Sequence, residues 1–391
     1  MIQKKLLLVG GSHADIPIIL AAQKLGYWVI TSGNNPNDLG HQFSNQYCPV
    51  DYSNNDKVFH LARQLNIDAI CASANDFSLL SCAYTAERLK LPGYDTYETS
   101  QIIHHKDKFR KFCLLYHLAV PKAIQFVKSS NINTICEKLN FPIIVKPIDL
   151  SGGKGIMKVT SKNELTKAIA HAFSLTKSPT LVVEEYIEGT NHGYSTFIKK
   201  GKVVFAFMDD EHYFINPYLV SGASTSLLYS KDVAVKLNET LEKIASKLDL
   251  VDGLLHVQFI LKDHTPYIIE ICRRTPGDLY VKLVKYATGF NMAEAIIQSI
   301  SNQLIKDYSI NQISYITRHC VMSSKQGYIE KVVYNNFASK IFEKMVFFTS
   351  GDKIENPLTY KAEIDFIQYN NRNDMQNYIN SIEKNIQIEF L

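Results

Sequence analysis

The chain lacks the features that mark membrane, disulfide-rich and zinc-binding proteins. None of its apolar runs approaches the roughly 20 residues that span a bilayer. Its seven cysteines are an odd number with no C-x-x-C pair, so neither a disulfide framework nor a structural zinc site is indicated. We therefore expect a cytoplasmic protein that does not act at a membrane.

Charge of one sign is also scarce. The 42 basic and 38 acidic residues leave a formal net charge of only +4, and no Lys/Arg block occurs. This balance argues against a nucleic-acid partner. The Walker G-x-x-x-x-G-K-[ST] motif is absent, and so is the complete G-x-G-x-x-G fingerprint. A P-loop enzyme is excluded, and a nicotinamide dehydrogenase stays a weak alternative.

What is present describes a multidomain α/β protein. A length of 391 residues predicts two to four domains. Over residues 1–105, short apolar strands alternate with helical patterns, which predicts a parallel sheet with crossover helices. Gly10, Gly11 and Ser12 occupy the first strand-to-helix turn, where backbone amides can hold an anion. Strands and hairpins are expected to dominate later in the chain, with a last helix over 374–384.

The most informative stretch is an apolar strand at 141–147 that carries Lys146, followed by a glycine-rich loop at 151–155. Glycine lets backbone amides approach phosphate oxygens closely. An acidic segment then follows at Glu184 and Glu185, and a predicted hairpin places Gln258 and Glu270 on neighbouring strands. Taken singly, the lysine and the carboxylates could each be ordinary surface residues. The order of these four segments along the chain favours a nucleotide site.

This order, from Lys108 to Arg274, resembles the ATP-grasp superfamily of carboxylate ligases. The resemblance implies a Rossmann-like domain (1–105), a small lobe (106–190), a large lobe for metal and substrate (191–308) and a β-rich C-terminal domain (309–391). In the small lobe, the glycine-rich loop at 151–155 would be a flap over the nucleotide, and the acidic segment at 184–187 would be the hinge between the lobes. The C-terminal part, through 325–329 and 350–354, more loosely resembles the small last domain of biotin-carboxylase-like and purine-synthesis members.

The same resemblance implies the ATP site. Lys108 and Lys146 would contact phosphates, the flap would cover them, and the acidic hinge would pair with adenine. Asn191 or His192 takes the place of the ribose-binding glutamate, with a plain loop role as the alternative. The residues implied for ATP are Lys108, Lys146, Ser151, Gly152, Gly153, Glu184, Glu185, Ile187, Asn191 and His192.

For the metal, the resemblance implies Glu270 and Gln258 as ligands of Mg²⁺, with Mn²⁺ as an alternative ion. Many family members have glutamate where this chain has Gln258 and asparagine where it has Cys272. Carbamoyl-phosphate synthetases also use glutamine at the first position. A thiol is a poor Mg²⁺ ligand, so Cys272 is not expected to coordinate the ion.

The resemblance also implies catalytic and substrate residues. Arg274 matches an arginine that stabilises the transferred phosphoryl group, with a surface salt bridge as the alternative. Lys154 of the flap is a second candidate catalytic residue. The cluster from Asp209 to His212 is read as a solvated turn or as an acidic lid that suits an amine. Candidate substrate residues are His212, Ser221, Arg273 and Gly277.

Together these features predict an ATP-dependent ligase that activates a carboxylate as an acyl phosphate for attack by an amine. Its partners would be small-molecule acids and amines, and a homodimer is compatible with the sequence. Two further alternatives stay open: a carboxyphosphate-forming carboxylase of the biotin or purine-synthesis type, and a non-catalytic nucleotide-binding module.

Overall fold

The N-terminal unit is a four-stranded parallel sheet in the order β3-β2-β1-β4, as strand–helix alternation predicts. A computed structural model of the chain describes residues 3–150, 153–303, 308, 310, 312–335 and 340–391. The strands are β1 (Lys5–Val9), β2 (Trp28–Gly33), β3 (Gln46–Pro49) and β4 (Ala69–Ala72), and the helices are α1 (Ile16–Lys24), α2 (Asn55–Leu65), α3 (Asp76–Leu89) and α4 (Tyr97–His104).

The glycine turn after β1 is filled by protein side chains. A Cβ atom on Gly11 would lie 2.0 Å from the His41 ring, and one on Gly10 would lie 2.3 Å from Ser73 Cβ. These glycines therefore allow close packing across the turn.

A small lobe follows, with a four-stranded antiparallel sheet in the order β5-β8-β6-β7. Its helix α7 begins after Ser161, whose hydroxyl accepts a hydrogen bond from the Glu164 amide and caps the first turn. The lobe comprises α5 (Lys106–Leu115), β5 (Ala123–Val127), α6 (Asn133–Lys138), β6 (Ile143–Pro147), β7 (Met157–Val159), α7 (Lys162–Leu175) and β8 (Thr180–Glu185).

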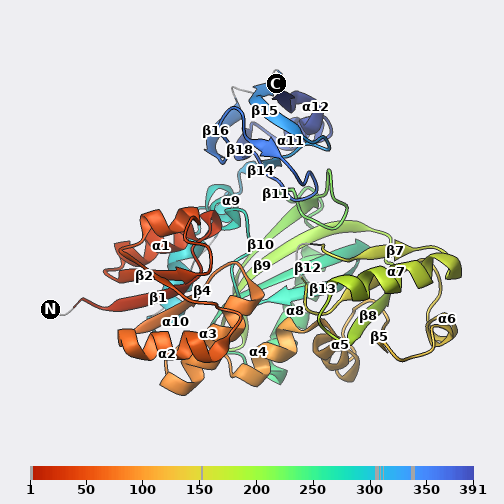
Figure 1. The fold of residues 1–391 in the computed structure, drawn as a ribbon, viewed down its shortest axis with the longest axis horizontal. Helices are drawn as coiled ribbons and strands as arrows, with labels where there is room; N and C mark the ends of the chain where they lie inside the picture. Colours follow the sequence, from red (N-terminus) through yellow and green to blue (C-terminus); the bar gives the residue numbers. More distant parts are fainter. Residues whose placement is uncertain (1–2, 151–152, 304–307, 309, 311, 336–339) are drawn as a thin grey trace.

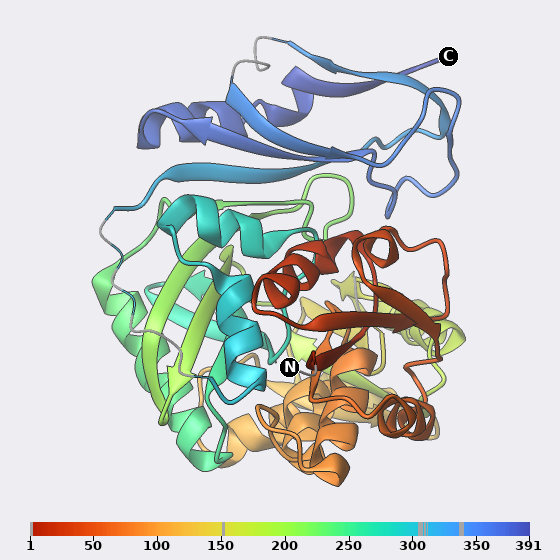
Figure 2. The ribbon, with the colours of Figure 1, turned by 90° about the vertical axis from the view of Figure 1, so that its left-hand side faces the viewer.

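The largest sheet has eight antiparallel strands in the order β13-β12-β9-β10-β11-β14-β18-β16. It extends from the large lobe into the C-terminal region, where it faces a smaller sheet, β17-β15-β19 (Figures 1 and 2). The elements are β9 (Thr190–Lys199), β10 (Lys202–His212), β11 (Gly222–Thr225), α8 (Lys231–Lys247), β12 (Gly253–Lys262), β13 (Thr265–Cys272), α9 (Tyr280–Thr288), α10 (Met292–Ile300), β14 (Tyr315–Val321), β15 (Gly327–Tyr334), β16 (Ile341–Val346), β17 (Lys353–Ile354), β18 (Glu363–Tyr369), α11 (Arg372–Ile379), α12 (Ile382–Asn385) and β19 (Ile386–Phe390).

Two of these elements differ from the sequence expectation. The helix expected over 374–384 is two short helices, because the chain turns at Asn380 and Ser381 between α11 and α12. The segment from Asp209 to His212 is the end of strand β10 rather than a solvated turn. Strand pairing explains the second difference, since residues 209–212 pair in antiparallel fashion with Gly222–Thr225 of β11 and Asp209 is fully buried in the sheet.

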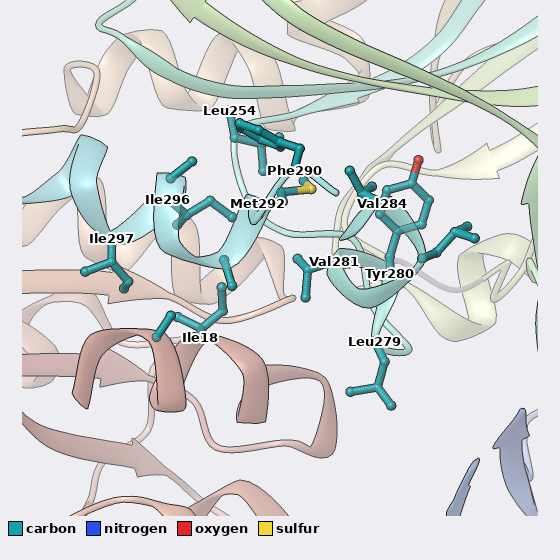
Figure 3. Packing of buried hydrophobic residues seen from close by; sticks show 14 of the residues in the cluster. Ile18, Leu254, Leu279, Tyr280, Val281, Val284, Phe290, Met292, Ile296 and Ile297 are labelled. Carbon is teal, nitrogen blue, oxygen red and sulfur yellow. The ribbon is translucent and has the colours of Figure 1, made fainter. Parts of the chain in front are cut away.

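Helices α9 and α10 join the N-terminal unit to the large sheet. Ile296 and Ile297 of α10 belong to the same buried cluster as Ile18 of α1 and Leu254 of β12, and Figure 3 shows α10 between these two neighbours. This packing fixes the N-terminal unit beside one face of the sheet. No helix among the described residues is long and apolar enough to cross a membrane.

Candidate functional site

A cleft of about 540 Å³ lies where the small lobe, the large sheet and the N-terminal unit meet. Its volume is within the range of small-molecule sites. The charged and amide side chains that line it are Lys106, Lys146, Lys158, Glu184, Glu185, Asn191, Asp209, Glu211, Gln258, Glu270, Arg274, Asp278 and Arg318.

Lys146 is held at the cleft wall by a buried carboxylate. Its Nζ atom lies 2.6 Å from Oε2 of Glu184, and Nε of Arg110 lies 2.6 Å from Oε1 of the same residue. Burial alone would raise the pKa of Glu184, but the two cations outweigh it and lower that pKa to about 2. Arg110 also donates to the Ile269 carbonyl, which connects strand β8 to strand β13.

The hinge segment lines the cleft as expected, through Glu185, Tyr186 and Ile187. The Lys158 ammonium lies 3.6 Å from the centre of the Tyr186 ring, a cation–π contact at the entrance. Asn191 also lines the cleft, whereas His192 does not. His192 is buried, and its ring nitrogens lie 2.6 Å from Thr190 Oγ1 and 2.9 Å from Asp210 Oδ1.

The described part of the flap contacts the loop between β10 and β11. Gly153 has φ of +73°, and a Cβ atom there would lie 2.6 Å from the Tyr218 carbonyl oxygen. The Lys158 amide donates to the Tyr218 hydroxyl at 2.9 Å. Ser151 and Gly152 lie outside the described residues. Lys154 is exposed and does not line the cleft.

The first helix of the small lobe presents a different lysine from the expected one. Lys108 is exposed and donates to Gln101 Oε1 at 2.8 Å. Lys106 instead lines the cleft, where its Nζ atom lies 3.6 Å from Glu270 Oε1. Two residues along a helix are separated by about 200° of rotation, so the two lysines leave α5 in opposite directions.

A polar row crosses the large sheet at the floor of the cleft. Strand register pairs Glu270 with Gln258, Gln258 with Gly193, and Gly193 with Asp209. Because paired residues point to the same face, this row confirms that Gln258 and Glu270 are neighbours. Glu211, two residues along β10, shares that face, and its Oε1 atom accepts a hydrogen bond from Gln258 Nε2 at 2.7 Å.

The donor set at this row fits a hard cation that also binds phosphate. Within the described parts of the chain, no three His, Cys, Asp or Glu side chains converge as a self-contained metal site. Glu270, Gln258 and Glu211 nevertheless present oxygen atoms, and Mg²⁺ takes the rest of its ligands from water and substrate phosphates. Cys272 is committed elsewhere, since its thiol lies 3.5 Å from the Arg274 carbonyl oxygen.

The two adjacent arginines after β13 have different roles. Arg274 lines the cleft, where Asp76 at the start of α3 accepts from its Nε atom at 2.7 Å. The Arg273 guanidinium donates hydrogen bonds to the Asp95 carboxylate and to the carbonyl oxygens of Val251 and Leu254. It is absent from the lining of the cleft and ties the large lobe to the N-terminal unit.

The remaining candidate substrate residues also divide. Gly277 lines the cleft. His212 and Ser221 do not line it, although their neighbours Glu211 and Val220 do, and the Ser221 hydroxyl accepts a hydrogen bond from the Phe214 amide. His212 accepts or donates one hydrogen bond with Ser224, and burial lowers its pKa to about 4.

Sequence reasoning missed Arg318, a buried cleft residue from β14. Its guanidinium lies 3.6 Å from Asp278, and its Nε atom has no hydrogen-bond partner among the described residues. Asp278 also pairs with Lys361 and His13, which brings three regions of the chain together. No local motif marked Arg318, since it enters the site only through the pairing of β14 with β11.

The chain is similar to known proteins over most of its length. The sequence profile of the ATP-grasp domain matches residues 106–277. The carbamoyl phosphate synthase large chain of Thermoanaerobacter sp. (strain X514) is 22% identical over 303 residues, which are 75% of this chain but 28% of that protein. The chain therefore spans well under half of that curated relative.

Two solved structures share the fold over nearly the whole chain. An L-amino acid ligase from Bacillus licheniformis superposes with a TM-score of 0.82 at 19% identity and covers 99% of both chains. The biotin carboxylase domain of the Hydrogenobacter thermophilus 2-oxoglutarate carboxylase, in complex with MgADP, ADP and bicarbonate, superposes with a TM-score of 0.77 at 17% identity, covering 100% of this chain and 91% of that one. At such low sequence identity, these superpositions show a shared fold and do not show the reaction or the substrates.

Proposed function

We propose that this chain, whose residues 106–277 form an ATP-grasp domain, is an ATP-dependent ligase that activates a carboxylate as an acyl phosphate for attack by an amine. The observation that carries the proposal is the cleft itself. It gathers Lys106, Lys146 and Arg274 around the oxygen ligands at Glu270 and Gln258.

The charges suit phosphoryl transfer, in which the protein mainly positions groups and neutralises charge. ATP would lie between the hinge at Glu185–Ile187 and the flap, with its phosphates toward Lys106 and Lys146. Magnesium, held at Glu270 and Gln258, supplies charge neutralisation of the phosphates when bound. Arg274, oriented by Asp76, would stabilise the phosphoryl group during transfer.

Arg318 supports a carboxylate as the acceptor. Its buried guanidinium lies at the cleft wall and is paired with Asp278, and its Nε atom, unpartnered among the described residues, leaves donor capacity that an anionic oxygen could use. Similarity of fold to an L-amino acid ligase supports an amino acid as the acid and another amino acid or peptide as the amine.

The test is an ADP-release screen over single amino acids, pairs of amino acids, dipeptides and bicarbonate. We expect release that depends on an amino acid and on Mg²⁺. ADP release with bicarbonate alone would assign the carboxylase alternative. ATP binding without turnover on any substrate would assign a non-catalytic module, and binding of NAD(H) in place of ATP would assign a dehydrogenase.

Variants define the roles in the same assay. Glu270→Ala should nearly abolish turnover, because a carboxylate brings full negative charge to a hard cation. Cys272→Ser should keep most of it, because the thiol contacts a backbone carbonyl oxygen. An unchanged rate and Mg²⁺ requirement in Glu270→Ala would remove the metal site from this proposal.

A further inference from the structure

The side chains of Gln258 and Glu211 form a hydrogen bond across an intervening strand, which has a glycine at this place. Strands β12 and β10 are separated by β9, and at this row β9 contributes Gly193. A Cβ atom on Gly193 would lie 2.4 Å from Asp209 Oδ1. The glycine therefore leaves the space in which side chains of β10 and β12 meet, and Gln258 Nε2 reaches Glu211 Oε1 at 2.7 Å.

This hydrogen bond determines which atom of Gln258 can bind a cation. Gln258 Nε2 donates to Glu211 Oε1, so the amide turns its NH₂ group toward Glu211. Its carbonyl oxygen is then left for a ligand on the side of Glu270. The amide acts as a neutral link between two carboxylates, one on β13 and one on β10.

Glu211 itself retains acceptor capacity. Gln258 donates to Oε1, and the Tyr213 hydroxyl donates to Oε2 at 2.6 Å. A carboxylate has about four lone-pair sites, so each oxygen can still coordinate a cation. Glu211 lines the cleft, and no Lys or Arg within salt-bridge distance of it is found among the described residues.

A second observation points to a cation at this place. Asp209 is fully buried, and its Oδ2 atom has no hydrogen-bond partner among the described residues. Its carboxyl group lies over Gly193, on the side toward β12. Its Oδ1 atom accepts a hydrogen bond from the Tyr280 hydroxyl, so within the described part of the chain Oδ2 is the atom left without a partner. Burial raises the pKa of this carboxyl group, and a cation beside Glu211 and Gln258 would satisfy Oδ2 and favour the ionised form.

We propose that Glu211 supplies the second protein carboxylate of the nucleotide-associated cation site, displaced from the metal hairpin to strand β10 and joined to it through Gln258. This inference rests on the proposed function, because the cation is the one that accompanies ATP. The resemblance alone suggests that Gln258→Glu is tolerated, because it restores the commoner pair of glutamates, and the hydrogen bond to Glu211 changes that expectation. A glutamate there would face the Glu211 carboxylate at hydrogen-bond distance, and like charges so close are destabilising without a cation.

The experiment exchanges the carboxylate and the amide between positions 211 and 258 and measures metal binding rather than turnover. Mn²⁺ affinity is measured by electron paramagnetic resonance at saturating ADP for the wild type, Glu211→Gln, Gln258→Glu and the double variant Glu211→Gln/Gln258→Glu. ADP affinity in EDTA and thermal unfolding in EDTA are measured alongside. Glu239→Gln, on the exposed face of α8, is the matched control.

We expect Glu211→Gln to weaken Mn²⁺ binding at least tenfold while ADP affinity in EDTA stays within threefold of the wild type. Gln258→Glu should unfold at a lower temperature in EDTA and regain stability with Mn²⁺. The double variant, which keeps one carboxylate and one amide in exchanged positions, should bind Mn²⁺ within threefold of the wild type.

Equal Mn²⁺ affinity in Glu211→Gln and Glu239→Gln would overturn the inference, as would a double variant no better than Glu211→Gln alone. A wild type that binds ADP but no Mn²⁺ would overturn it as well. Failure of the proposed function has different signatures. A chain without a nucleotide site would bind no ADP in EDTA or with metal, and a non-catalytic module would bind ADP without turning ATP over.

Discussion

Glu184 accepts hydrogen bonds from Arg110 and Lys146 at the same distance of 2.6 Å, although only Lys146 faces the cleft. One carboxylate thus serves two purposes. With Arg110 it connects α5, β8 and β13 inside the protein, and with Lys146 it holds an ammonium where a nucleotide phosphate would lie. Removing Lys146 should therefore affect mainly nucleotide binding, whereas removing Arg110 should affect mainly the stability of the fold.

Lys146→Ala should weaken ATP binding at least tenfold, because a charge-assisted contact to phosphate contributes about 1.5–3 kcal/mol. Isothermal titration with ATP measures the change. Lys162→Ala, an exposed lysine of the same lobe, is the control and should bind as the wild type does. A folded Lys146→Ala protein with wild-type ATP affinity would contradict the assignment of the nucleotide site.

Arg110→Met should lower the free energy of unfolding by about 3–5 kcal/mol, because it leaves a buried carboxylate short of one partner. The matched control is Lys202→Met. Its pair with Glu242 has the same 2.6 Å separation, but the Lys202 side chain is 73% exposed against 5% for Arg110. The control should cost less than about 1 kcal/mol. Urea denaturation compares the two, and equal losses would show that burial does not strengthen this pair.

The flap should exchange amide hydrogens more slowly when MgATP is bound. Gly153 and Gly155 both have φ of +73°, a conformation that glycine adopts readily, and we expect a bound nucleotide to reduce the backbone freedom of the loop. Hydrogen–deuterium exchange over residues 151–155, with and without MgATP, measures the effect. Peptides from α2, which is remote in sequence, serve as the reference. Identical exchange in both states would exclude ordering of the flap by nucleotide.

His319 should make the protein less stable in acid. Burial lowers its pKa to about 3 from an ordinary value of 6.5. Between these values the unfolded chain binds a proton that the folded chain does not, so the free energy of unfolding falls as pH falls. The slope is at most about 1.4 kcal/mol per pH unit.

His319→Gln should remove that contribution, so its stability should fall less steeply than that of the wild type between pH 6 and pH 4. Urea denaturation at three pH values gives the slopes. His60→Gln, at an exposed position of α2, should keep the wild-type slope. The expectation for His319 is wrong if its variant and the control behave alike.

The sequence by itself determined the order of the elements and the hairpin neighbours. Lys146 follows from an apolar strand that ends beside a glycine loop, and the pairing of Gln258 with Glu270 follows from the two-residue period of adjacent strands. Both depend on interactions between residues close in the chain, which local patterns encode. The roles proposed for these residues stay predictions.

Only the tertiary structure decided which other side chains reach the cleft. Lys106 rather than Lys108 faces it because of the rotation of α5 against β13. Arg273 does not reach it, because its guanidinium hydrogen-bonds Asp95 of the N-terminal unit. The sequence suggested that Glu211 belongs to a solvated acidic turn, but it is a half-buried strand residue beside Gln258. Arg318 lies 44 residues beyond Arg274 in the chain and enters through the order of an eight-stranded sheet. Such pairings between distant segments are set by packing of the whole sheet, and no local pattern of residues records them.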